Sequence, residues 1–172
     1  MIALRKPLRA DARRLAEAGN HPEIADTMIS LPNPFCVEDA EAWITATRER
    51  SDADGYVIEH GRDTTIIGAA QLRDIDLENR QAEVSFWLVP AMWGQGCASS
   101  ALRQLCRIGF DRFGLNRLYG YHMARNPASG QVMARCGFQL EGCLRQRIWK
   151  HGRAEDVMLW SRLARDPLGG AQ

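Results

Sequence analysis

Two closely spaced glycines, Gly94 and Gly96, precede a run of small residues from Cys97 to Ser100. A glycine lacks the Cβ atom that would keep a ligand away from the main chain. The first amides of a helix have no intrahelical partner and lie at the positive end of the helix dipole. If a helix begins after Gly96, this turn can therefore hold an anionic group such as a pyrophosphate.

Three interpretations of this glycine turn compete. A P-loop requires a lysine after its last glycine, and none follows Gly96. A dinucleotide fingerprint requires a third glycine in an early βαβ unit, whereas this turn lies halfway along the chain. A strand–helix turn that contains glycines without binding a ligand explains the spacing alone as well as an anion site does.

The elements around the turn follow from hydrophobic periodicity and from turn residues. Runs rich in β-branched and aromatic residues predict strands at Ile2–Leu8, Gly55–Glu59, Thr64–Leu72, Ala82–Val89, Arg117–Met123, Phe138–Trp149 and Asp156–Leu163. Helical spacing predicts helices at Ala12–Ala18 (capped by Asp11), His21–Ile29, Val37–Arg50, Ser99–Phe113 and Pro127–Arg135. This order predicts a mixed α/β sheet in a single domain.

The composition excludes several classes of protein. A chain of 172 residues with a net charge of +1 gives no global reason to expect nucleic acid or a membrane surface as a partner. Five cysteines without a CxxC pair and four scattered histidines argue against a metal site or a disulfide framework. Because no signal peptide or membrane-spanning stretch is visible, we expect a cytoplasmic protein. We expect the domain to span residues 1–165 and a frayed tail to follow at 166–172.

The segment Trp93–Ala98 resembles motif A of the GNAT N-acetyltransferase superfamily, Arg/Gln-x-x-Gly-x-Gly/Ala, with tryptophan at the first position. The strand EVSFWLVP and the later segments NPAS, CGF and EGCLR resemble the branch of ribosomal-protein N-terminal alanine and serine acetyltransferases. The resemblance covers nearly the whole chain and is strongest from Glu83 to Arg145. It implies a single-domain GNAT fold with a mostly antiparallel mixed sheet, splayed central strands and helices on both faces.

The resemblance also implies acetyl-coenzyme A (acetyl-CoA) as cosubstrate, without a metal. The strands Ala82–Val89 and Arg117–Met123 would splay apart, and the pantetheine arm would fill the gap like a missing strand. The N–H of Val89 would stabilise the oxyanion. Asn126 would contact the pantetheine or cap the helix that starts at Pro127. The cofactor-binding residues implied in this way are Leu88, Val89, Gly94, Gln95, Gly96, Cys97, Ala98, Ser99 and Asn126.

The implied chemistry is direct attack of a neutral amine on the thioester. Ser129, the serine of the NPAS segment, would hydrogen-bond or protonate the departing thiolate, unless it is an ordinary serine of a first helical turn. Glu83 would act as a base through water, unless it only pairs with an arginine. Tyr121 can replace a missing group, because Met133 stands where many members have a tyrosine and Ile148 where close relatives have a glutamate. A covalent intermediate on a cysteine is disfavoured because direct transfer does not need one.

The acceptor is the least defined part of the resemblance. A protein N-terminal α-amino group is the expected acceptor, while the same scaffold also serves polyamines, amino acids and aminoglycosides. The acidic residues Asp74, Asp76 and Glu78 would attract a cationic acceptor or simply face solvent. Aromatic residues that line an acceptor cavity, or belong to the core, are Phe35, Trp43, Phe86, Trp87 and Trp149. A non-catalytic acyl-CoA sensor and a nucleotide-binding protein are the alternatives, and the branch resemblance implies a homodimer.

Overall fold

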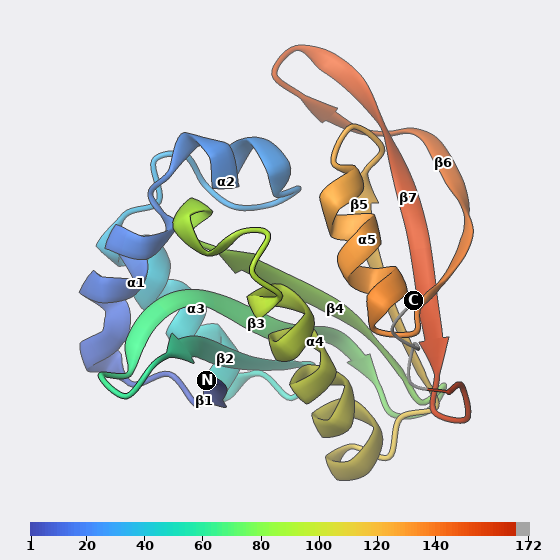
Figure 1. The fold of residues 1–172 in the computed structure, drawn as a ribbon, viewed down its shortest axis with the longest axis horizontal. Helices are drawn as coiled ribbons and strands as arrows, with labels where there is room; N and C mark the ends of the chain where they lie inside the picture. The colour runs from blue at the N-terminus through green and yellow to red at the C-terminus, as the bar shows by residue number, and fades with distance from the viewer. Residues whose placement is uncertain (168–172) are drawn as a thin grey trace.

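The computed structural model, which describes residues 1–167, contains one seven-stranded sheet with the strand order β1-β2-β3-β4-β5-β7-β6 (Figure 1). Within these residues only β4 and β5 pair in parallel, and the other neighbouring strands are antiparallel. The predicted mixed, mostly antiparallel sheet is confirmed. The strands are β1 Ile2–Arg5, β2 Ala53–His60, β3 Thr65–Asp76, β4 Gln81–Leu88, β5 Arg117–Met123, β6 Gln139–Lys150 and β7 Arg153–Leu163.

Helices cover both faces of the sheet, as predicted (Figure 1). Successive residues of a strand point to opposite faces: Val57 packs with α1 and α3, whereas Ile58 packs with α4. No helix within residues 1–167 is both long enough and apolar enough to cross a bilayer. The helices are α1 Ala12–Gly19, α2 Pro22–Thr27, α3 Val37–Glu49, α4 Cys97–Arg107 and α5 Pro127–Arg135, and a π-helical turn, Ile108–Arg112, extends α4.

The parallel pairing of β4 with β5 is short. It joins Gln81 to Arg117, Ala82 to Leu118 and Glu83 to Tyr119, and it extends no further in the register of the two strands. Beyond Glu83 the strands diverge, so that the edge of β4 faces a gap instead of a neighbouring strand (Figure 1). The predicted splay of the central strands is confirmed.

Several predicted helix ends differ from the structure, among them the end of the helix predicted at His21–Ile29, which stops at Thr27. Asp11 does not cap α1, because its carboxylate accepts the Leu8 N–H at 2.7 Å and pairs with Arg5 at 2.8 Å. The helix predicted to end at Phe113 changes from the α-helical to the π-helical hydrogen-bond pattern after Arg107 and ends at Arg112. The predicted tail at 166–172 lies outside the described residues from residue 168 onward, and Asp166 still accepts the Leu163 N–H at 2.8 Å.

Glu141, near the start of β6, connects β6 to β5 and β7 beside the parallel pairing of β4 with β5. Its carboxylate oxygens each accept a hydrogen bond of 2.6 Å from Arg117 on β5, and Ser161 on β7 donates a third at 2.6 Å. The Arg117 guanidinium is the main reason that the pKa of Glu141 falls from 4.5 to about 2. A carboxyl whose pKa is depressed in the folded state stabilises the fold above its unfolded-state pKa.

Glu141→Gln is therefore expected to lower Tm slightly at pH 7. The difference in Tm between the wild type and the variant should shrink as the pH falls from 4.5 to about 2, because the wild-type carboxyl becomes protonated in that window. Salt should also reduce the difference, since the pair is partly exposed. Thermal melts across this pH range, with the exposed helical Glu41→Gln as control, measure the effect. A difference that does not change with pH would contradict the assignment.

Candidate active site

The edge of β4 that faces the gap is defined by the β3–β4 register. The N–H of Val89 donates to the Ile67 carbonyl at 2.8 Å, and the Val89 carbonyl accepts the Met92 N–H at 3.0 Å. In an antiparallel ladder the next residue directs its main-chain groups to the opposite side. Leu88 therefore directs its N–H into the gap. The Val89 N–H, which was predicted to stabilise the oxyanion, is therefore already bonded to β3, while the Val89 carbonyl keeps a second lone pair.

Trp93, which occupies the arginine or glutamine position of the motif, fastens the glycine turn to β4. Its indole N–H donates to the Leu88 carbonyl at 2.8 Å. A carbonyl oxygen has a second lone pair, so this bond still leaves Leu88 able to accept from a ligand amide. The tryptophan therefore positions the turn relative to the strand and supplies no charge to it.

The glycine turn has the geometry of an anion cradle. Gly94 and Gly96 have positive φ angles of 73° and 77°, which glycine adopts at little cost. A Cβ atom at either position would meet nothing within 4 Å, so the approach to the main chain is open. The first helical bond of α4 runs from the Ser100 N–H to the Gly96 carbonyl at 3.0 Å, which leaves the N–H groups before Ser100 at the free start of the helix. These groups suit a pyrophosphate.

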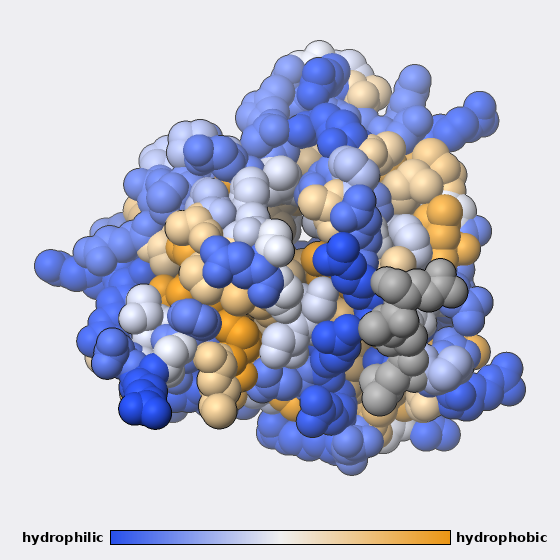
Figure 2. Space-filling view, viewed as in Figure 1, coloured by the Kyte–Doolittle hydropathy of each residue, from blue (hydrophilic) through white to orange (hydrophobic). Residues whose placement is uncertain are grey.

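A groove of about 210 Å³ runs from the glycine turn along the end of β4, between α2 and α5. An opening between these helices is visible in the space-filling view (Figure 2). Gln95 turns its side chain to the Ala91 carbonyl at 2.7 Å, and the Cys97 side chain is buried in the core, so these two can offer only main-chain amides. The predicted cofactor-binding residues that line the groove are Leu88, Gly94, Gly96, Ala98, Ser99 and Asn126.

The three predicted catalytic residues, Ser129, Glu83 and Tyr121, line one small cavity of about 40 Å³. Ser129 also lines the groove, so it lies where the two spaces meet. The Asn126 side chain donates to the Ser129 Oγ at 2.9 Å instead of capping α5. Because Asn126 is the donor in that bond, the Ser129 hydroxyl keeps its own hydrogen for another acceptor.

Glu83 is a buried carboxylate with a single cationic neighbour on the adjacent strand. It is 9% exposed, and the Arg73 Nε lies 3.2 Å from its Oε1. Burial raises the pKa of Glu83, while the Arg73 charge opposes the rise. A raised carboxyl pKa suits a group that must accept a proton from an amine, directly or through water.

The same small cavity contains His122, which the sequence analysis missed. Trp160 Nε1, which can only donate, bonds to the His122 Nε2 at 2.9 Å, and the Nδ1 lies 2.8 Å from the Met123 carbonyl. The ring is therefore neutral, with its hydrogen on Nδ1, and burial lowers its pKa. Since both nitrogens are engaged, His122 supports the wall and is not a free base. No spacing pattern around His122 could have revealed this.

A larger cavity of about 370 Å³ lies on the α1–α3 side of the sheet. Phe35, Trp43 and Trp87 line it, and Phe86 lines the groove and the small cavity. Trp149 is 75% exposed, so its predicted place at the acceptor cavity is wrong. Met28 lines all three spaces and thus connects the cofactor side with the far cavity.

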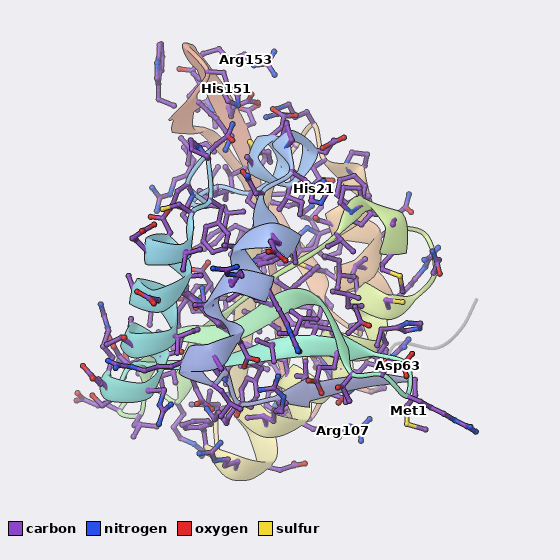
Figure 3. The ribbon with its side chains drawn as sticks, turned by 90° about the vertical axis from the view of Figure 1, so that its left-hand side faces the viewer. Met1, His21, Asp63, Arg107, His151 and Arg153 are labelled. Carbon is purple, nitrogen blue, oxygen red and sulfur yellow. The ribbon has the colours of Figure 1, made fainter. Side chains whose placement is uncertain are left out.

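A cluster of ion pairs holds α2 and Met28 over these cavities. Arg125, just before α5, contacts the Asp26 carboxylate at 2.8 and 3.1 Å and the Glu155 carboxylate at 2.9 Å. Lys150, at the end of β6, donates to the Met28 carbonyl at 2.5 Å. Figure 3 shows the tip of the β6–β7 hairpin projecting at the opposite end of the molecule from Met1. The hairpin and the β5–α5 loop therefore fix α2 from the side.

Arg125→Gln is expected to raise KM for acetyl-CoA several-fold with a smaller change in kcat, because α2 forms one wall of the groove. Arg153→Gln is the matched control, since Arg153 pairs with the same Glu155 but does not contact α2 in the described residues. Initial rates over a range of acetyl-CoA concentrations measure the difference. Equal KM values for both variants would show that the contact with Asp26 does not shape the groove.

A helix start with open amides, a strand edge left free by the splay and a serine between two cavities fit the acetyl-CoA site that the resemblance to GNAT enzymes implies. Among residues 1–167, no group of three or more His, Cys, Asp or Glu residues is arranged to hold a metal. The pyrophosphate would lie at the glycine turn and the pantetheine along β4.

Comparison with known proteins gives the family. The acetyltransferase (GNAT) domain profile matches residues 2–139. The uncharacterized N-acetyltransferase YoaA of Bacillus subtilis (strain 168) is 32% identical over 163 residues, covering 93% of this chain and 92% of that protein. The ribosomal-protein-serine acetyltransferase of Escherichia coli (strain K12) is 34% identical over 102 residues, covering 59% of this chain and 57% of that protein.

A solved structure agrees with the fold. The spermidine N-acetyltransferase of Vibrio cholerae, in complex with CoA and spermine, has a TM-score of 0.84 and 23% sequence identity over 94% of this chain and 95% of that chain. The chain belongs to the GNAT acetyltransferase family and is an acetyl-CoA-dependent N-acetyltransferase.

Proposed function

We propose that the protein transfers an acetyl group from acetyl-CoA to the α-amino group of a protein N-terminus. The observation that carries this proposal is the position of Ser129 and Glu83. The cavity that both residues line shares Ser129 with the cofactor groove, and shares Met28 and Arg73 with the large aromatic cavity. An amine that enters from the aromatic cavity can therefore meet a thioester held in the groove.

The residues supply each step of a direct transfer. An α-amino group has an intrinsic pKa of about 7.7–8.0, so part of it is already neutral near physiological pH. Glu83 accepts the proton that the amine loses on attack, through a water molecule if the distance requires one. The Leu88 N–H stabilises the oxyanion, and the Ser129 hydroxyl donates a hydrogen bond that stabilises the departing thiolate, which then takes its proton from solvent.

The charge of the acceptor side favours a small, singly charged amine over a polycation. The charged side chains that line the two acceptor-side cavities are Asp39, Arg73 and Glu83, and Glu83 is already paired with Arg73. A polyamine would need several free carboxylates to replace its hydration. The name of the similar Escherichia coli protein, a ribosomal-protein-serine acetyltransferase, agrees with a protein acceptor.

A thiol-release assay with acetyl-CoA tests the proposal. The acceptors are peptides that begin with Ser or Ala, spermidine, free amino acids and an aminoglycoside. We expect the peptides to give the highest kcat/KM. Faster turnover of spermidine would replace the proposed acceptor with a polyamine, whereas CoA binding without turnover on any amine would indicate an acyl-CoA sensor.

A further inference from the structure

Arg73 carries hydrogen-bond donors that the described protein does not use. Its side chain lines both acceptor-side cavities. The one hydrogen bond assigned to it is a long one, 3.3 Å from Nη1 to the Ser30 Oγ. The buried Nε lies 3.2 Å from the Glu83 Oε1 as an ion pair, but within residues 1–167 it has no partner with the alignment of a hydrogen bond. Arginine has five N–H donors in a planar fork that fits carboxylate and carbonyl oxygens. A buried donor without a partner is costly, so a ligand oxygen that satisfies it is favoured.

The position of Arg73 relative to Glu83 restricts what that ligand can be. The β3–β4 register places the two residues opposite each other, and the Nε–Oε1 distance is 3.2 Å. Glu83 is an acceptor of hydrogen bonds and Arg73 is a donor only. A molecule that binds both must therefore carry an amine and an oxygen acceptor within one short unit. An α-aminoacyl group meets this requirement. An alkylamine or a polyamine has no oxygen acceptor, and the lone pair of its neutral nitrogen is needed for attack on the thioester.

We infer that Arg73 recognises the carbonyl oxygen of the first residue of the acceptor and thereby selects an α-aminoacyl amine. This inference rests on the proposed acetyl transfer. With the amine at Glu83 and its own carbonyl at Arg73, the rest of the peptide extends into the aromatic cavity of about 370 Å³. Arg73 is then a specificity-determining residue, and a free carboxylate at the same position is the alternative source of the oxygen.

The test compares acceptors that differ in the carbonyl group. Alaninamide and a peptide that begins with Ala carry the carbonyl, free alanine carries a carboxylate, and sec-butylamine carries neither. Each is assayed with the wild type, Arg73→Met and Arg147→Met. Arg147 is the matched control, because its charge acts on Glu83 but it does not line either cavity. Differences in basicity between the amines cancel when each variant is compared with the wild type on the same amine.

Arg73→Met is expected to lower kcat/KM for alaninamide and the peptide by about 10- to 100-fold, the effect of losing a hydrogen bond to a charged group. Its effect on sec-butylamine should be less than about 3-fold, and Arg147→Met should not distinguish the acceptors. An equal decrease on all amines would overturn the inference and leave Arg73 as the counter-ion of Glu83. If Arg73→Met lowers kcat/KM more for free alanine than for the peptide, Arg73 binds a carboxylate, and the inference that it binds a peptide carbonyl is overturned.

Arg73→Lys keeps a positive charge beside Glu83 but lacks the planar guanidinium. It can therefore be tested on the same acceptors if Arg73→Met does not fold. It should lose selectivity for the carbonyl while retaining turnover of sec-butylamine. If no amine releases thiol with the wild type, the proposed function fails. If amines are acetylated without preference for a carbonyl, only the role of Arg73 fails.

Discussion

Ser129→Ala lowers kcat by about 100-fold or more, the usual contribution of a well-placed hydrogen-bond donor to a developing negative charge, and leaves KM for acetyl-CoA nearly unchanged. The hydroxyl is placed for this role because Asn126 donates to its oxygen at 2.9 Å and leaves its hydrogen available. The alanine removes the hydroxyl without disturbing α5, since Ser129 is only half-buried. Stopped assays of kcat and KM, together with a CoA-binding titration, measure the two effects separately.

Two further variants make this prediction specific. Asn126→Ala keeps the hydroxyl but removes its orienting donor, so it should lower kcat less than Ser129→Ala does. Ser129→Thr keeps a hydroxyl and should retain more turnover than the alanine variant. Full turnover by Ser129→Ala would show that the thiolate leaves without help from this side chain, and Ser129 would then be an ordinary residue of the first turn of α5.

Gly68→Ala both destabilises the protein and weakens acetyl-CoA binding. Gly68 on β3 lies opposite Leu88, and a Cβ atom there would lie 2.1 Å from the Trp87 carbonyl oxygen and 3.0 Å from the Leu88 Cα. Both neighbours are main-chain atoms, so the end of β4 must move to relieve the clash. Overpacking of this kind costs about 1–3 kcal/mol. The same shift displaces the Leu88 N–H that faces the gap.

We therefore expect a lower Tm for Gly68→Ala and a KM for acetyl-CoA that rises by about 10-fold, the cost of roughly one misplaced hydrogen bond. Gly142→Ala on β6 is the control, because a Cβ atom at that position meets nothing within 4 Å. Thermal melts and acetyl-CoA saturation curves measure both effects. An unchanged KM in a destabilised Gly68→Ala variant would place the binding edge of β4 elsewhere.

The sequence predicted well those features that depend on neighbouring residues. The boundaries of β5 and α5 were predicted correctly, because a period-2 pattern and an Asn-Pro start are local signals. The glycine turn was also visible, since positive φ angles at Gly94 and Gly96 require glycine. The resemblance to GNAT enzymes added the splay of the central strands, which local patterns alone did not contain.

The tertiary structure decided the features that depend on register. Whether Leu88 or Val89 directs its N–H into the gap depends on the pairing of β3 with β4, and a shift of one residue would exchange them. The same register places Arg73 beside Glu83, although ten residues separate them in the chain. The exposure of Trp149 was likewise not predictable from the sequence, because it depends on where the β6–β7 hairpin tip ends and not on the residue being a tryptophan.

The glycine turn and the strand before it were therefore readable from the sequence by itself, because consecutive residues form each of them. The acceptor side was not readable. Its walls come from α1, α2, the loop after α2, α3, β3, β4, β5 and α5, which only folding brings together. Chemical identity and spacing along the chain do not determine such distances, so the partners of Glu83, Ser129 and His122 emerged only from the three-dimensional structure.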